Sequence, residues 1–134
     1  MASRIYKAKR KNWRELPREK WWIEGAIFEG KENSYIITNV KVTDEWEDSE
    51  IGADVIGYLV DPETICQDTG LTDLEGRKIF EGDILKIPEK KNHNVKFEYG
   101  QFCVGINCPI AYIRTECEII GNIFDNPELI GEQP

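Results

Sequence analysis

The sequence predicts a mainly β protein made of small antiparallel sheets that are joined by short 3-10 or helical turns. Short runs rich in β-branched and aromatic residues recur along the chain, and Gly, Pro, Asn or Asp bounds each run. Residues 95–99 alternate cleanly between apolar and polar side chains, as expected of a half-buried strand. Gly70, Gly76 and Gly82 recur at equal spacing. We interpret these glycines as backbone hinges in a sharply turned β structure.

The length of 134 residues favours one domain or two small lobes that share a core. We place the boundary near Cys66, which gives a smaller β-rich N-terminal lobe over residues 1–65 and a C-terminal β-roll over residues 66–134. The contents of hydrophobic residues (40%) and charged residues (31%) are those of an ordinary soluble protein. There is no long apolar run, and charged residues interrupt the N-terminus from Arg4 onward, so we expect a cytoplasmic protein with no membrane contact.

The N-terminal lobe is predicted to contain a β-hairpin followed by a further strand. Trp21–Phe28 and Tyr35–Val42 are apolar and β-branched, and the polar turn Glu29–Ser34 separates them. Asp54–Val60 has the composition of another strand, and Asp61–Thr64 turns the chain toward the C-terminal lobe. The tryptophans of this region are predicted to fill a core more readily than to form a ligand platform, because each buries a large apolar area.

An acidic run, Asp44–Glu50, surrounds Trp46 between these strands. The simplest interpretation is a solvated loop. A partner-binding acidic-aromatic loop, or a mimic of nucleic acid, is the sharper alternative. A calcium loop is not expected, because the strict ligand spacing with a central glycine is missing.

The C-terminal lobe opens with the strongest turn signal of the chain. Asp73 and Gly76 occupy the first and fourth positions of a predicted type I turn. Near the end, Asn126 is predicted to be a helix N-cap and Pro127 the first residue of a helical turn. The predicted strands are residues 77–80, 84–87, 95–99, 102–106, 111–114 and 117–124.

The chain resembles the YopX family of phage and prophage proteins. Two long segments carry most of the resemblance, Thr69–Leu85 (TGLTDLEGRKIFEGDIL) and Ile119–Ile130 (IIGNIFDNPELI). Four shorter segments precede them: Ile5–Ala8, Trp22–Gly25, Tyr35–Ile37 and Val60–Thr64. All six follow one another along the chain as in the family. Thr43–Gly52 and Asn92–Thr115 are the least family-like parts. The resemblance implies a mainly β fold with an SH3-like C-terminal barrel, carriage on phage genomes and residence in the host bacterial cytoplasm. The family has no established biochemical activity, and the resemblance supplies no catalytic or binding residues.

Charge is distributed unevenly. Residues 1–22 contain eight basic and two acidic residues, which gives +6, and the rest of the chain has 17 − 8 = 9 basic and 25 − 2 = 23 acidic residues, which gives −14 and a total of −8. The basic segment could contact nucleic acid or an acidic partner, with Trp13, Trp21 and Trp22 stacking on bases. The candidate contact residues are Arg4, Lys7, Lys9, Arg10, Lys11 and Arg14. The plainer alternative is that the segment lies against the acidic body of its own or a neighbouring molecule, or is solvated.

No catalytic, metal or cofactor site is predicted. The four cysteines, Cys66, Cys103, Cys108 and Cys117, lack the close pairs of a structural zinc site and are expected to be buried thiols in a reducing cytosol. The one histidine, His93, lies in a polar loop sequence, and nothing places it beside Cys103 or Cys108 as a base beside a nucleophile. A phosphate loop and the common hydrolase and dinucleotide motifs are absent from the sequence.

Three functional hypotheses follow from the sequence. The first is a non-catalytic protein-interaction module, or a self-assembling protein, of phage origin that binds through its β surface. The second is a nucleic-acid-associated accessory protein that uses the basic segment. The third, an enzyme, has the least support. The predicted fold is compatible with all three, so the fold cannot decide between them.

Overall fold

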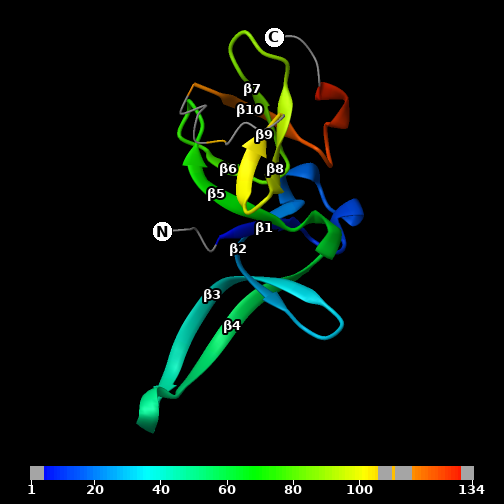
Figure 1. Ribbon diagram of the computed structural model, residues 1–134. Coiled ribbons are helices and arrows are strands. Elements are labelled where there is room, and N and C mark those ends of the chain that lie inside the picture. The colour runs from blue at the N-terminus through cyan, green and yellow to red at the C-terminus, as the bar shows by residue number, and fades with distance from the viewer. Residues whose placement is uncertain (1–4, 106–109, 111–115, 131–134) are drawn as a thin grey trace. The chain divides into compact units, whose positions relative to one another are not determined.

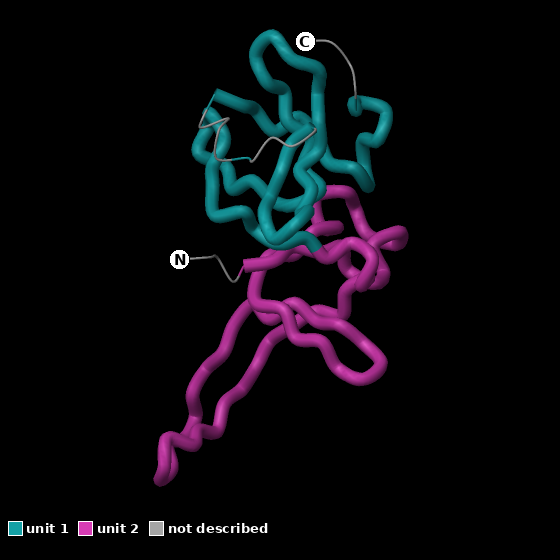
Figure 2. The backbone as a smooth tube through the Cα atoms, viewed as in Figure 1, with its two compact units in different colours: residues 1–3, 66–134 teal, residues 4–65 magenta. Residues whose placement is uncertain are grey.

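The computed structural model describes residues 5–105, 110 and 116–130, and it is mainly β, with antiparallel strands and short 3-10 turns (Figure 1). The prediction of the fold class is confirmed in this respect. The chain divides into two compact units (Figure 2), which we call the N-terminal unit (Arg4–Ile65) and the C-terminal unit (from Cys66 onward). Within the described residues, no helix has the length and apolar character needed to cross a membrane.

The N-terminal unit contains four antiparallel strands that lie in the order β4, β3, β2, β1. Their bounds are β1, Tyr6–Lys9; β2, Trp22–Glu29; β3, Ser34–Glu45; and β4, Ile51–Val60. Two 3-10 turns, η1 (Trp13–Glu15) and η2 (Arg18–Lys20), connect β1 to β2, and two more, η3 (Glu47–Ser49) and η4 (Pro62–Thr64), precede and follow β4. The predicted hairpin is therefore confirmed as β2 and β3.

The core of the N-terminal unit is small. Ala8, Ile36 and Val60 are buried in it, and four partly buried residues pack around them: Tyr6, Ile23, Ile27 and Ile65. Gly25 allows this close packing, because a Cβ at this position would collide with the carbonyl oxygen of Ile37 on the neighbouring strand. The close approach of β2 and β3 at the base of the unit therefore requires a glycine at position 25.

β3 and β4 extend beyond β2 as a two-stranded ribbon that ends in η3 (Figure 1). β2 pairs with β3 only as far as Ile37, whereas β3 and β4 stay paired up to Glu45 and Ile51. At about 3.3 Å per residue, the unsupported part is about 20 Å long. The solvated loop predicted for Asp44–Glu50 is wrong at its start, because Asp44 and Glu45 continue the hydrogen-bonded ladder of β3.

In its described residues, the C-terminal unit contains a pair, β5–β6, and four strands in the order β10, β7, β8, β9. Their bounds are β5, Cys66–Thr72; β6, Lys78–Phe80; β7, Asp83–Lys86; β8, His93–Glu98; β9, Gln101–Val104; and β10, Glu118–Asn122. A final 3-10 turn, η6, spans Pro127–Leu129. The core residues are Ile79, Leu85, Ile87, Val95, Val104, Ile110 and Cys117.

The SH3-like barrel expected for this unit is not seen, since no sheet of the described residues closes. Closure would require the edge strands β9 and β10 to pair, and the described ladders leave both at the ends of the order. Strand β5 was not predicted, because Gly70 was interpreted as a turn residue although it lies within a strand at a register shift. The strand predicted over residues 111–114 lies outside the described residues.

The turn predictions have two different outcomes. The turn from Asp73 to Gly76 is confirmed, because the Gly76 N–H donates to the Asp73 carbonyl oxygen at 3.0 Å and Gly76 has a φ of +80°. Pro127 begins η6 as predicted. Asn126 is the N-cap of η6, as predicted, but it makes no side-chain capping hydrogen bond; its side-chain oxygen accepts a hydrogen bond from the Asn122 N–H at 3.3 Å.

Candidate interaction surface

One side of the β3–β4 sheet carries exposed apolar side chains, and we call this side the outer face. Alternation along the paired strands puts Leu59, Val55 and Ala53 on the same side as their partners on β3. The exposed apolar residues of the outer face are Phe28 (58%), Val40 (51%), Val42 (48%), Ile51 (53%), Val55 (54%) and Leu59 (43%). The outer face is therefore a continuous apolar surface along the ribbon and onto β2.

The opposite side, the inner face, has the reverse character along the ribbon. At the base of the sheet it carries Ile36 and Val60, which are buried in the core of the unit. Beyond the base it carries a cross-strand pair of opposite charge, Lys41 and Asp54, and a single large apolar residue, Ile56. The apolar side of the ribbon is thus the side that points away from the core of its own unit.

The end of the ribbon, residues 44–50, is acidic, and we call it the tip. Its carboxylates are Asp44, Glu45, Glu47, Asp48 and Glu50. Trp46 is 58% exposed among them, with its ring close to Gly52. Asp48 and Ser49 adopt left-handed backbone conformations, with φ of 57° and 67°, which close the turn. The tip therefore presents an exposed indole within a negative field.

Lys9, a candidate contact residue, is buried in a group of three tryptophans. Its ammonium nitrogen lies 3.8 Å from the ring centroid of Trp13, 4.7 Å from that of Trp21 and 5.7 Å from that of Trp22. Its backbone N–H donates to the Thr64 hydroxyl at 2.8 Å. Lys9 is only 3% exposed. Its charge is stabilised by the ring faces of its own unit.

The other candidate residues lie nearer the surface, and most of them also stack on aromatic rings. The distances to the ring centroids are 5.0 Å for Lys7 on Trp22, 4.4 Å for Arg14 on Trp13, 4.4 Å for Arg10 on Tyr58 and, outside the predicted set, 5.4 Å for Arg18 on Trp21. Each of the three tryptophans proposed to stack on bases thus has a cation of its own unit on its ring. Arg4 lies outside the described residues.

An open groove of about 590 Å³ lies beside the last residues of β4. Its lining residues are Arg10, Lys11, Asn12, Glu15, Tyr58 and Leu59. The Arg10 Nε is buried and has no hydrogen-bond partner among the described residues. The Lys11 N–H donates to the Leu59 carbonyl oxygen at 2.9 Å, which places the basic segment next to the base of the outer face. Lys11 is exposed, and its ammonium donates to the Asn33 side chain at 3.1 Å.

The tightest polar cluster of the C-terminal unit surrounds Asp73, whose side chain is 0% exposed. Its carboxylate accepts from the backbone N–H groups of Glu75 (3.0 Å), Arg77 (2.9 Å) and Ile119 (3.1 Å) and pairs with the Arg77 guanidinium at 3.0 Å. Burial raises the pKa of this carboxyl, but the hydrogen bonds and the guanidinium outweigh burial, so the pKa lies below its usual 3.8. The cluster fastens β10 to the turn before β6.

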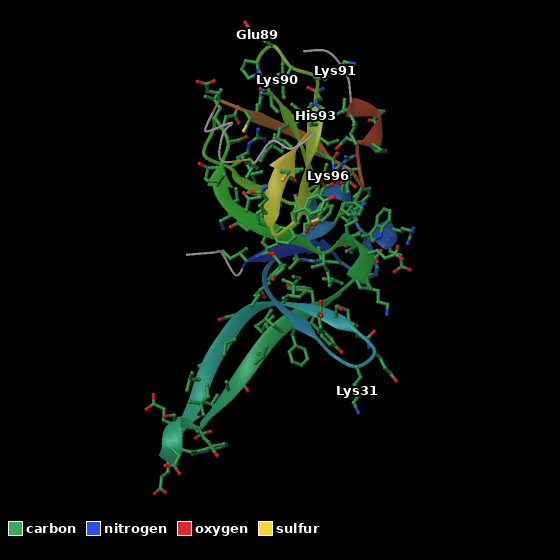
Figure 3. All side chains as sticks on the ribbon, in the orientation of Figure 1. Lys31, Glu89, Lys90, Lys91, His93 and Lys96 are labelled. Atoms are coloured by element: carbon green, nitrogen blue, oxygen red, sulfur yellow. The ribbon has the colours of Figure 1, made fainter. Side chains whose placement is uncertain are left out.

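The cysteines and the histidine do not form a reactive pair in the described residues. Cys66, Cys103 and Cys117 are buried thiols, as expected, and Cys108 lies outside the described residues. Burial raises the pKa of the Cys117 thiol, and the Asp73 charge raises it further. Alternation in the β8–β9 ladder puts Cys103 on the opposite face from His93, which lies in β8 (Figure 3).

No three His, Cys, Asp or Glu residues within the described part of the chain are arranged to hold a metal ion. Lys90 and Lys91 form a separate basic loop before β8, and Lys31 extends from the turn between β2 and β3 (Figure 3). These lysines are not part of the predicted contact set.

The outer face was not identified from the sequence. Its signal is the alternation Val40-Lys41-Val42 opposite Ala53-Asp54-Val55, which indicates a two-faced hairpin. Alternation alone normally indicates an apolar side that is buried within the same molecule. Only the strand pairing reveals that the β2–β3 ladder ends at Ile37, before these residues, so that β3 and β4 continue as a two-stranded ribbon.

The fold defines a mainly β protein with an apolar ribbon and no recognisable catalytic centre in its described residues. A family model, described as YopX protein, matches residues 17–131, so the chain belongs to the YopX family. The crystal structure of protein EF1440 from Enterococcus faecalis is similar, with 28% identity, a TM-score of 0.55 and coverage of 94% of this chain and 96% of that one. No curated protein matches the chain.

Proposed function

We propose that the protein is a non-catalytic protein-interaction module, an accessory protein of a phage or prophage that acts in the host cytoplasm. The binding element is the β3–β4 ribbon. The observation that supports this proposal is the outer face, where four valine and isoleucine side chains of the ribbon are about half exposed: Val40, Val42, Ile51 and Val55. Contiguous apolar surface of this kind is unusual on a protein that has no partner, and is typical of binding sites.

The shape of the ribbon also supports a binding role. Exposed apolar edges and faces of small sheets promote unwanted association, and a chain that retains such a face gains from it only when a partner covers it. The tip adds Trp46, a residue type enriched at the centres of protein interfaces. The Trp46 ring lies beside Gly52 on the inner side of the ribbon, so the outer face supplies the apolar stripe and the tip adds a separate exposed indole.

The test is the capture of partners from lysogenic or infected cells by the tagged protein. We expect a stoichiometric protein that Val55→Asp releases and Ile56→Asp retains. These neighbouring side chains are a matched pair, 54% and 55% exposed on opposite faces of the same strand. If both variants behave like the original protein, the ribbon is not the binding element.

Nucleic-acid binding through the basic segment is the second candidate. It is supported by the groove, where the exposed Lys11 ammonium can exchange its hydrogen bond to Asn33 for one to a phosphate oxygen. Its test is DNA affinity at two salt concentrations, with Lys11→Glu and Arg14→Glu as the variants. This candidate is supported if the affinity for DNA falls with salt and is lost when both substitutions are combined. Absence of DNA binding at low salt removes it.

A further inference from the structure

Strand β4 lies at the end of the strand order, so one row of its backbone N–H and C=O groups faces away from β3. At the base of the sheet the chain itself uses this row. The Leu59 carbonyl oxygen accepts from the Lys11 N–H at 2.9 Å, and the Asp61 N–H donates to the Lys9 carbonyl oxygen at 2.9 Å. The segment from Lys9 to Lys11 therefore acts as a short additional strand that runs antiparallel to the end of β4.

The rest of this row, nearer the tip, is open. Backbone groups alternate in direction along a strand, so the residues at steps of two from Leu59 face the same way as Leu59. The Ile56 carbonyl oxygen, which is out of step with them, accepts from the Thr38 hydroxyl of β3 at 3.4 Å. Among the described residues, no backbone hydrogen bond reaches the row between Ile51 and Gly57 from the side away from β3. The residues of this row, which we call the open edge, are Ile51, Ala53, Val55 and Gly57.

The open edge lacks the devices with which edge strands usually avoid pairing. β4 contains no proline and no lysine, and its alternation is unbroken, because both register shifts of the ladder insert the extra residue in β3. The one charged residue of β4, Asp54, lies opposite Lys41 in the ladder. The other edge of the ribbon, on β3, carries Lys41 and both irregularities. Of the two edges of the ribbon, the one on β4 is thus the one suited to pairing.

The groove lies where the segment from Lys9 to Lys11 leaves this edge. Alternation puts Tyr58 on the inner face and Leu59 on the outer face, so a groove that both residues line runs along the edge of β4. Lys11 and Asn12, where the chain turns away from β4 into η1, also line it. The groove therefore leaves room for another strand to continue along β4 from the point where the chain's own segment ends.

We propose that the open edge of β4 binds an extended segment of a partner protein by strand addition. The added strand follows the line of the segment from Lys9 to Lys11 and runs antiparallel to β4, from the groove toward the tip. This inference rests on the proposed function and names the form in which the partner binds. A row of backbone donors and acceptors at ladder spacing is complementary to an extended polypeptide, whereas the backbone groups of a helix are already paired within it.

The neighbouring side chains define the chemistry of the added strand. Every second side chain of that strand lies on the outer face, beside Ala53, Val55 and Leu59. These neighbours are apolar and exposed, so we expect apolar residues, mostly β-branched, at alternate positions of the partner segment. A proline at a paired position would remove a donor, so we expect none there.

The first experiment selects peptides of about twelve residues from a displayed random library on the immobilised full-length chain. We expect enriched peptides with alternate apolar residues and few prolines. Ala53→Pro removes one N–H of the open edge and no bond to β3, and it should weaken an enriched peptide at least about tenfold. Ala53→Ser, the matched control, keeps the N–H and should bind as the original protein does. Absence of enriched peptides, or equal binding by the two variants, overturns the inference.

The second experiment uses the original protein, so it does not depend on the folding of a variant. Amide hydrogen exchange is measured with and without a synthetic enriched peptide. The peptide should slow exchange at the amides of the open edge and leave those of Asp54 and Ile56, which already face β3, unchanged. A peptide that binds without slowing the amides of the open edge overturns the inference. Slowing of these amides when only the concentration of the chain is raised would assign the edge to a second copy and also overturn it.

These outcomes are separable from those of the proposed function. A captured protein that Val55→Asp releases and Ala53→Pro retains keeps the proposed function and overturns strand addition, because the partner then binds the side chains of the outer face. A captured protein that both variants release and Ala53→Ser retains supports both. Captures that are insensitive to Val55→Asp and to Ala53→Pro remove both.

Discussion

The two units of the molecule differ in how far they bury their apolar residues. Among the described residues, the C-terminal unit buries seven in one cluster, whereas the cluster of the N-terminal unit has three. The large exposed apolar residues follow the reverse distribution, with Leu74, Phe97, Tyr99 and Ile130 in the C-terminal unit and Phe28, Val40, Val42, Trp46, Ile51, Val55, Ile56 and Leu59 in the N-terminal unit. The C-terminal unit is stabilised by its own interior, and the N-terminal unit keeps apolar surface available for another molecule.

Buried polar groups show the same contrast. The Asp73 carboxylate of the C-terminal unit has three backbone donors and a guanidinium. The Arg10 Nε of the N-terminal unit is buried without a hydrogen-bond partner among the described residues. An unsatisfied buried donor costs roughly 1–3 kcal/mol, and such a cost is removed when a partner supplies the acceptor.

The largest expected effect is on the Asp73 cluster. Asp73→Ala should lower the free energy of unfolding by about 3 kcal/mol or more, because it leaves buried N–H groups and Arg77 without their acceptor. Glu75→Ala is the control, since its carboxylate is 60% exposed and lies 3.6 Å from Arg77. It should cost less than about 0.5 kcal/mol. Urea denaturation measures both, and similar losses would mean that the cluster is not what fastens this unit.

A smaller effect is expected at the base of the N-terminal unit. Gly25→Ala should cost about 2 kcal/mol, because the new Cβ meets the Ile37 carbonyl oxygen and β2 must move away from β3. Gly52→Ala, in the ribbon, is the control. The nearest atom to its new Cβ is the Asp44 carboxylate at 3.3 Å, which can rotate away. Thermal unfolding should separate the two variants, and an unaffected Gly25→Ala would show that the base tolerates looser packing.

These two sites also show how far the sequence could predict the structure. Local chemistry was sufficient for the turn at Asp73, where the carboxylate and Gly76 act within four residues. It was also sufficient for the hairpin of β2 and β3, since its strands and turn are contiguous. It was incomplete at Asn126, which is the N-cap of η6 but whose side-chain oxygen accepts from the Asn122 N–H and does not cap the turn.

The outer face and the basic segment needed long-range information. Lys9 and Arg14 have the sequence of a solvated basic stretch, and only the folding of η1 and η2 brings tryptophan rings onto them. The exposure of Val40 depends on where β2 stops pairing, which no pattern within β3 encodes. The charge pattern of the sequence thus identifies the candidate contact residues, but it does not predict the tryptophan rings that surround them.

The pH dependence of the Asp73 contribution is expected to be smaller than the effect of the alanine substitution. The folded-state pKa lies below the usual 3.8, so the stabilisation is fully present above 3.8 and is lost as the pH falls through the folded pKa. The difference in unfolding free energy between the original protein and Asp73→Asn should therefore be constant near neutral pH and shrink in acid. Urea titrations at about pH 7 and pH 3 measure it, and a difference that grows in acid would contradict the depressed pKa.

The smallest expected effect concerns the ribbon in dilute solution. Val55 and Ile56 are equally exposed, so Val55→Asp and Ile56→Asp should differ in unfolding free energy by less than about 0.5 kcal/mol where the chain is monomeric. When a captured partner protein is added, the original protein and Ile56→Asp should gain stability by mass action, while Val55→Asp should not. A large difference between the variants in dilute solution would mean that the outer face packs within a single chain. The N-terminal unit would then be stabilised from within, like its C-terminal neighbour, and the contrast between the two units would disappear.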